Sequence, residues 1–179
     1  KSNVYTSTDA SMTGTTIDDN VSSNKAKVNI EAIGNNALTT SADALSVSAG
    51  SGLKGVIGAA VSIVNSDADT SATINNASIK AQDVIVKGVS NNESLNVAIG
   101  LSVAAGSNAS LSGAGNVATN NIANDTTVTI AGTTIDASGT VAALANSNEV
   151  LRNYGGAASV SATSGASIAL GGTVVVNTI

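Results

Sequence analysis

A pentapeptide recurs along this 179-residue chain at nearly even spacing. Gly14–Asp18 and Gly132–Asp136 both read GTTID, and Asn76–Lys80 reads NASIK, which keeps the central Ser/Thr and the Ile. The first interval is 62 residues and the second is 56. Self-similarity at a fixed period indicates a repeat architecture, in which each supersecondary unit packs on the next one. This repeat constrains the fold more tightly than any other feature of the sequence.

The similarity extends beyond the pentapeptide. Asp69–Gly100 aligns without a gap with Asp125–Gly156 and is identical to it at ten positions. A Glu follows the Ile of the pentapeptide by 14 residues in all three copies, which gives Glu31, Glu93 and Glu149. We therefore expect the six additional residues of the first interval to lie between Ile33 and Asp69, in a segment rich in Gly, Asn and Ser.

Apolar and small polar residues alternate through most of the chain, as in VNIEAI, DVIVKG and TVVVNTI. A period of two residues indicates β-strands. Asn, Gly and Ser interrupt this alternation repeatedly, and Asn and Gly are typical turn residues. We therefore expect short strands joined by tight turns. The Ala-rich stretch at 139–151 is the place where a helix is an alternative.

The composition favours a narrow core. The chain has no Pro, Cys, His, Trp or Phe and only 1% aromatic residues, while 42% of its residues are hydrophobic. The many Val, Ile and Thr residues argue against disorder, which favours Pro and charge. Small aliphatic side chains fill a core that is one or two residues thick, and the absence of Pro suits strands that are paired on both sides.

These features together predict an all-β parallel β-helix, or β-solenoid. Its coils would lie about 4.8 Å apart, the ordinary spacing of neighbouring strands, with like residues in ladders. A 56-residue unit is longer than we expect for one coil, so we divide it into three coils of about 19 residues or two of about 28, and favour three. We expect residues 1–179 to form a single segment of a longer repeat protein, with further coils on either side.

The charge and hydropathy patterns exclude some partners. The net charge is −5, and the seven basic residues are scattered along the chain, so nucleic-acid binding lacks the cations that it requires. No apolar run reaches the 18 residues of a transmembrane helix, and we expect a chain that does not span a membrane. The absence of Cys suits a protein that is exported unfolded.

No catalytic constellation is visible, so we expect a chain that is not an enzyme and has no cofactor. Without His or Cys, Ser–His chemistry and Cys/His zinc sites are excluded. Asp18–Asp19 and the pair Asp67/Asp69 could ligate calcium or form a glycosidase pair. We interpret them instead as solvated Asp residues of turns, because few basic or aromatic residues accompany them.

Three further patterns are candidates for a binding surface. Glu31, Glu93 and Glu149 recur in phase and define a possible exposed acidic face, although one charged outward residue per unit would also serve solubility. The Asn pairs are either a binding ridge or turn residues with some amide ladders; they lie at Asn35–Asn36, Asn75–Asn76, Asn91–Asn92 and Asn120–Asn121. Thr13/Thr15 and Thr127/Thr129 are short Thr-x-Thr pieces of the kind found in ice-binding solenoids.

Gly55–Gly88 resembles the passenger repeats of large type V secreted bacterial proteins, namely autotransporter adhesins, filamentous-haemagglutinin-like proteins and leukotoxins of the fusobacterial kind. The similar elements are a Gly-Ala-Ala-Val run at Gly58–Val61, an Asn at Asn65, an alternating stretch at Ala72–Ile74 and a Val-x-Val strand at Val84–Val86. A second pass follows at Gly113–Ile130.

This resemblance implies a right-handed parallel β-helix that is secreted or held at the bacterial cell surface. It implies a virulence role as a rigid shaft in an adhesin or a leukotoxin-like protein, with a host cell-surface protein or glycan as the partner. One alternative is a dedicated receptor- or glycan-binding module. The others are a polysaccharide-active β-helix enzyme and an ice-binding solenoid.

Overall fold

The computed structural model describes residues 1–19 and 26–179, and its regular structure in these ranges is entirely β-strand. In this part of the chain no helix is present that is long and apolar enough to cross a membrane. The strands are β1 (Ser2–Thr13), β2 (Thr16–Asp18), β3 (Lys27–Ala49), β4 (Leu53–Asn75), β5 (Ser78–Ala81), β6 (Asp83–Gly106), β7 (Ala109–Ala123), β8 (Thr126–Ala131), β9 (Thr134–Ala137), β10 (Val141–Thr163) and β11 (Ala166–Thr178).

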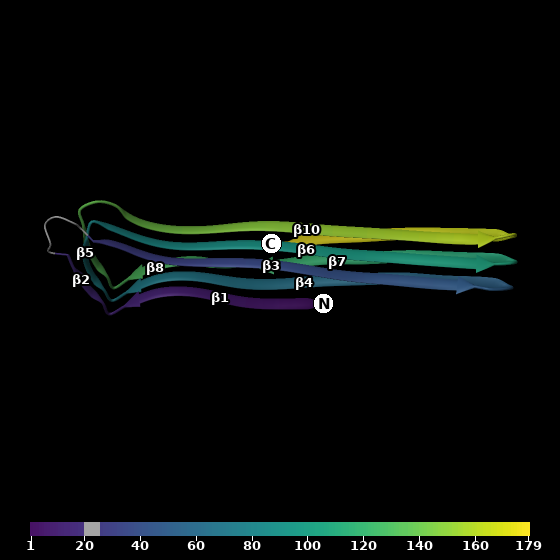
Figure 1. Ribbon diagram of the computed structural model, residues 1–179, viewed down its shortest axis with the longest axis horizontal. Helices are drawn as coiled ribbons and strands as arrows, with labels where there is room; N and C mark the ends of the chain where they lie inside the picture. Colours follow the sequence, from purple (N-terminus) through teal and green to yellow (C-terminus); the bar gives the residue numbers. More distant parts are fainter. Residues whose placement is uncertain (20–25) are drawn as a thin grey trace.

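The strands form three parallel sheets. Sheet A has the order β1-β4-β7-β11, with β8 also paired to β4. Sheet C has the order β10-β6-β3, and the small sheet B has the order β2-β5-β9. Figure 1 shows sheets A and C running along the length of the molecule, with β2 and β5 at one end. We call that end proximal, and the opposite end, where β3 turns into β4, distal.

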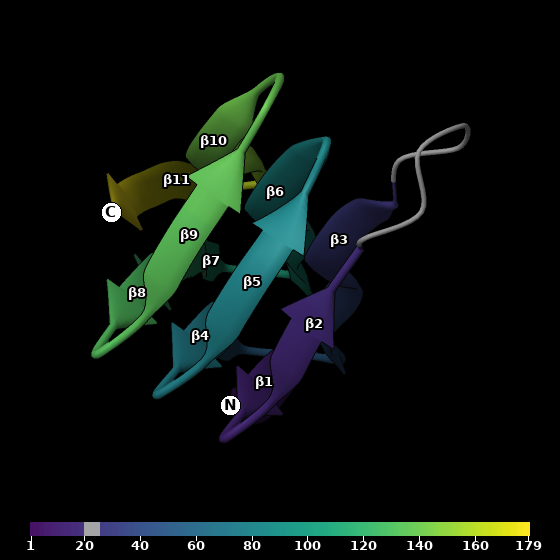
Figure 2. The same ribbon diagram turned by 90° about the vertical axis from the view of Figure 1, so that its left-hand side faces the viewer.

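Each 56-residue unit forms one coil. The chain runs along sheet A in β4, crosses sheet B in β5 and returns along sheet C in β6. It then begins the next coil in β7, whose Ala109 pairs with Leu53. Figure 2 shows β2, β5 and β9 side by side at the crossing. The all-β parallel solenoid is thereby confirmed, and the expectation of two or three coils per unit is wrong.

Strand length explains this difference. β3, β4 and β10 have 23 residues each and β6 has 24, so each spans about 75 Å at 3.3 Å per residue. The longest dimension lies along the strands and not along the stacking direction (Figure 1). The Asn, Gly and Ser residues that suggested turns, such as Asn35–Asn36 in β3, lie within these strands because like residues of the next coil pair with them. The Ala-rich stretch at 139–151 enters β10 and is not helical.

The recurring pentapeptide marks the turn from sheet A into sheet B. Gly14, Asn76 and Gly132 open the three copies, and their backbone φ angles are 61°, 50° and 58°. Gly and Asn tolerate this left-handed conformation best. Three residues later the Ile of each copy enters sheet B, where Ile79 pairs with Ile17 on one side and Ile135 on the other. The predicted row of Ile residues is thereby confirmed.

The register between coils changes at two places. The offset is 62 up to the pair Asp18–Lys80 and 56 from the pair Lys27–Asp83 onward. The six additional residues therefore lie between β2 and β3, and the expectation that they follow Ile33 is wrong. The predicted site was chosen because that segment is rich in Gly, Asn and Ser, but those residues belong to long strands.

The second change is a single residue between β9 and β10. Ala137 pairs with Ala81 at an offset of 56, whereas Val141 pairs with Val84 at an offset of 57. Gly139 occupies this step and donates its N–H to the carbonyl of Gln82. Since side chains alternate between the two faces of a strand, a shift of one residue exchanges the inward and outward sets of β10.

The largest apolar cluster lies at the proximal end, where the three sheets enclose it. The central coil supplies its best buried members, Ile74, Ile79, Val84 and Val86, each at most 1% exposed. Burying a Val or Ile side chain stabilises a fold by about 1.5–3 kcal/mol. The other buried members are Val28, Ala32, Ala72, Ala77 and Ala81.

Towards the distal end only sheets A and C remain, and the interior narrows to Gly, Ala, Ser and Asn. A Cβ atom on Gly58 would lie 2.4 Å from the carbonyl oxygen of Leu101, and one on Gly100 would lie 2.4 Å from that of Gly115. Glycine at these positions allows the sheets to approach more closely than the usual distance of about 10 Å. The side chain of Asn96 bridges the gap, donating to the carbonyls of Ser62 and Thr119 at 3.3 and 3.0 Å.

Candidate binding face

Charged and amide side chains gather on the outer surface of sheet C, towards the proximal end. We call this surface the polar face. The alternation along β3, β6 and β10 points these side chains away from sheet A, and the register brings them into rows across the coils. The polar face comprises Lys27, Glu31, Asn35, Asp83, Lys87, Asn91, Glu93, Asn148 and Arg152.

Ion pairs join neighbouring coils across the polar face. Lys27 Nζ lies 3.0 Å from Asp83 Oδ2, and Lys87 Nζ lies 2.5 Å from Glu31 Oε1. Glu93 pairs with Arg152 on the next coil. Each of these carboxylates is therefore neutralised by a cation of an adjacent strand, and each pair favours the observed register over a shifted one.

Two carboxyl groups have lowered pKa values. The hydrogen bond from Lys87, assisted by its charge, lowers the pKa of Glu31, and desolvation opposes this effect in part. The pKa of Asp83 is lowered first by the backbone N–H of Thr140, at 2.9 Å, and next by Lys27. Both groups are held in the charged form to a lower pH than an unpaired carboxyl.

A ladder of amides crosses the centre of the polar face. Asn91 Nδ2 donates to Asn35 Oδ1 at 2.9 Å, and Asn148 continues the row on β10. These side chains line an open groove of about 280 Å³, together with Glu93 and Val150. Amides present both donors and acceptors, so this groove offers a ligand a row of neutral hydrogen-bonding groups bordered by the Glu93–Arg152 ion pair.

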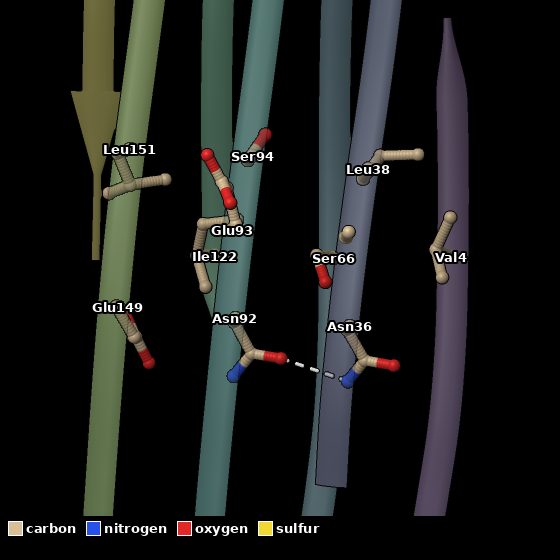
Figure 3. A pocket seen from close by; sticks show the side chains of 11 residues that line it. Val4, Asn36, Leu38, Ser66, Asn92, Glu93, Ser94, Ile122, Glu149 and Leu151 are labelled. Atoms are coloured by element: carbon tan, nitrogen blue, oxygen red, sulfur yellow. Dashed lines mark hydrogen bonds between the residues drawn. The ribbon is translucent and has the colours of Figure 1, made fainter.

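Behind this groove, a second polar row faces the interior. Asn36 Nδ2 donates to Asn92 Oδ1 at 2.9 Å, and Glu149 follows in the same row on β10. Figure 3 shows Asn36, Asn92 and Glu149 on adjacent strands around a cavity of about 110 Å³. Glu149 Oε1 accepts a hydrogen bond from Asn124 at 2.7 Å, whereas its Oε2 is buried without a hydrogen-bond partner.

The structure does not place the three predicted Glu residues in one row. Glu31 pairs in register with Lys87, Glu93 with Ala37 and Val150, and Glu149 with Asn92. Glu31 and Glu93 belong to the polar face, and Glu149 points to the interior. The predicted continuous acidic face is therefore wrong. The six additional residues before β3 and the one before β10 displaced the true register from the apparent 14-residue phase.

The Asn pairs are mostly strand residues with amide ladders. Asn35–Asn36, Asn91–Asn92 and Asn120–Asn121 lie in β3, β6 and β7, whereas Asn76 lies in a turn. A further ladder crosses sheet A, where Asn121 donates to Asn65 and Asn65 donates to Asn3, each at 2.8 Å. The expectation of amide ladders is confirmed, and the expectation that these pairs sit in turns holds only for Asn75–Asn76.

The other candidate residues are dispersed over sheets A and B. Asp18 pairs with Lys80, which in turn pairs with Asp136, and Asp19 accepts a hydrogen bond from the backbone of Ala26. Asp67 and Asp69 point outward from β4, within a strand and not in a turn. The residues that the structure describes hold no group of three or more Asp or Glu side chains suited to a metal ion.

The Thr-x-Thr piece of β8 lies beside matching hydroxyls. Thr127 and Thr129 pair with Ser71 and Thr73 of the previous coil, and Ser11 continues the second row on β1. Thr13 instead pairs with Asn75. The outer surface of sheet A therefore carries a small flat array of hydroxyl groups near the proximal end.

Sequence reasoning missed Lys27, Asp83, Lys87 and Arg152 as members of the polar face. A signal was present for the first three, because Lys27 and Asp83, and Glu31 and Lys87, are opposite charges at the repeat distance of 56. Comparison of the chain with protein families, curated proteins and solved structures finds no match.

Proposed function

We propose that this chain is a stiff β-solenoid segment of a large secreted or surface-exposed bacterial protein, in which it acts as a shaft rather than as an enzyme. The observation that carries the proposal is the continuous pairing of β3 with β6 and of β6 with β10, over about 23 residues on both sides. A coil held in this way cannot bend without breaking many parallel hydrogen bonds at once. The resemblance of Gly55–Gly88 to type V passenger repeats supports a location outside the cell.

The geometry also suits extension. β3 and β10 leave one hydrogen-bonding edge each on opposite sides of sheet C, and the strands of sheets A and B end in the same way. Another coil of similar length could pair with either edge, because nearest-neighbour contacts are the basis of repeat folds. Additional coils would lengthen the molecule along the stacking direction by about 4.8 Å each and would cover edges that are otherwise prone to aggregation.

Small-angle X-ray scattering and cell binding test this proposal together. A shaft segment gives a flat particle about 75 Å across, the length of a 23-residue strand, and the fluorescently labelled chain shows no saturable binding to host cells. A compact sphere would contradict the fold, and saturable binding would contradict a purely structural role.

The second candidate function is recognition of a host glycan or surface protein through the polar face. The groove along Asn35, Asn91 and Asn148 favours it, since sugars are bound by rows of neutral donors and acceptors. A glycan array separates the two candidates. Binding that Asn91→Ala abolishes and Asn65→Ala leaves unchanged supports recognition, because Asn65 holds the equivalent ladder position on sheet A.

A further inference from the structure

The distal half of sheet A has an apolar outer surface, which we call the apolar face. It comprises the outward residues of β4 from Leu53 to Ile63 and their register partners in β7 and β11. None of these outward residues is charged, and Thr119 is the polar exception. The large side chains exposed on it are Leu53, Ile57, Val61, Leu111, Ile168, Leu170, Val174 and Val176.

The apolar face is large enough to be an interface. Its eight exposed aliphatic side chains are between 42% and 77% accessible. Together they present on the order of 800 Å² of apolar surface, which is about what one partner contributes to a stable protein–protein interface. Soluble monomers rarely expose a contiguous apolar patch of this size, so the face is expected to be covered.

The relief of the apolar face is self-complementary. Val61, Val117 and Val174 pair in register and form a ridge across the three strands. The adjacent outward row is Ala59, Gly115 and Gly172, which forms a trough. The trough belongs to an open groove of about 410 Å³ whose far border is Ile57 and Leu170.

We propose that two copies of this chain pair face to face through their apolar faces. With the strands of the copies antiparallel, the Val ridge of each copy lies in the Ala/Gly trough of the other, because the ridge and trough are neighbouring rows about 7 Å apart. A two-fold axis relates such a pair, so the same surface serves both copies. The contact is a dry interdigitation of small and branched side chains of the steric-zipper kind.

This pairing does not depend on the proposed function, since a shaft and an adhesive segment would form it alike. It would double the thickness of the molecule and bury the apolar face, while the polar face on sheet C stays exposed. Association and host-cell binding are measured separately, so failure of one leaves the other standing.

Filling the trough tests the proposal without disturbing the single chain. A Cβ atom on Gly172 would meet no atom within 4 Å, so Gly172→Leu fits the isolated fold but occupies the space of the partner's ridge. The matched control is Gly156→Leu, whose Cβ also meets nothing within 4 Å and which lies on the outer surface of sheet C. Both variants add the same apolar side chain.

Sedimentation velocity across a wide concentration range is the measurement. The unaltered chain and Gly156→Leu are expected to form a dimer, and Gly172→Leu is expected to weaken it about thirtyfold or more, the effect of losing an interface hot spot. Val117→Asp, which places a charge on the ridge, is expected to act like Gly172→Leu. Far-ultraviolet circular dichroism checks that each variant remains a β protein.

Several outcomes would overturn the proposal. One is an unaltered chain that stays monomeric at its highest soluble concentration. Another is equal dimer stability for Gly172→Leu and Gly156→Leu, or tighter association of Gly172→Leu, which would indicate unspecific hydrophobic contact. Co-flotation with phosphatidylcholine vesicles, lost in Val117→Asp and not accompanied by dimers, would assign the apolar face to lipid instead.

Discussion

Glu31 and Lys87 face each other across neighbouring coils, with Lys87 Nζ 2.5 Å from Glu31 Oε1. The two residues are one repeat apart, and their pairing fixes β3 against β6 in the observed register. A shift of one residue would place each of them on the opposite face from its partner. The pair therefore contributes to the choice of register as well as to stability.

The Glu31–Lys87 pair predicts a pH dependence. The folded pKa of Glu31 is lowered, so its contribution is fully present above the unfolded pKa of about 4.3 and is lost as the pH falls through the lower, folded value. Glu31→Gln should lower the melting temperature slightly at neutral pH and leave it unchanged in strong acid. Thermal unfolding followed by circular dichroism at several pH values measures this difference.

Salt and a second substitution serve as controls for this effect. Because the pair is exposed, added salt should reduce the difference between Glu31→Gln and the unaltered chain at neutral pH. In a Lys87→Met background, Glu31→Gln should lose most of its effect. A melting-temperature difference that is the same at every pH would refute the role of this ion pair.

Ile79 should be the most sensitive position of the proximal core. It is 1% exposed and lies between Ile17 and Ile135. Ile79→Ala should destabilise the fold by about 2–5 kcal/mol, because it removes buried methyl groups and leaves a cavity. Ile99→Ala is the control at an outward position that is 40% exposed, and urea unfolding of both variants should show a much smaller loss there.

The comparison of sequence and structure shows why the fold was easier to predict than the site. The Ile row was visible because Ile17, Ile79 and Ile135 follow the left-handed turn by the same number of residues, with no change of register between turn and Ile. The parallel solenoid follows from that row and from the alternation, both of which are local properties.

The coil length and the acidic row depended on longer-range information. Local sequence cannot separate an Asn that turns the chain from an Asn that continues a strand through an amide ladder, and Asn35–Asn36 is of the second kind. Opposite charges at the repeat distance, such as Lys27 and Asp83, would have revealed the register. Gly139 is a single-residue step that an ungapped alignment overlooks, and it decides which way Glu149 points.

Close contact of the two sheets predicts that Gly100 cannot be replaced. A Cβ atom there would lie 2.4 Å from the carbonyl oxygen of Gly115 on the opposite sheet, so Gly100→Ala must push the sheets apart. We expect a loss of about 1–3 kcal/mol, as for other overpacked cores. Gly172→Ala is the matched control, because its Cβ meets open space, and chemical unfolding should show no loss of stability for it.

The turn position of the pentapeptide predicts an asymmetric response to substitution. Asn76 has a φ of 50° where the other two copies have Gly, so Asn76→Gly should fold with similar stability. Asn76→Ala should cost about 1–2 kcal/mol, the usual penalty for a side chain with a Cβ in the left-handed region. Thermal unfolding compares the two variants, and equal stability of both would contradict the assigned turn.

Disulfide trapping tests the register of the third coil, for which the alignment and the structure disagree. The ungapped alignment matches Glu93 with Glu149, whereas the structure pairs Glu93 with Val150 on the same outward face and turns Glu149 to the interior. The chain has no Cys, so engineered pairs give no background. Glu93→Cys with Val150→Cys should oxidise readily, because neighbouring strands bring the Cα atoms within the roughly 4.4–6.8 Å that a disulfide requires. Glu93→Cys with Glu149→Cys should oxidise slowly, because its side chains point to opposite faces, and mass spectrometry after mild oxidation measures both. Faster oxidation of the second pair would show that β10 follows the 56-residue offset and that the step at Gly139 is absent.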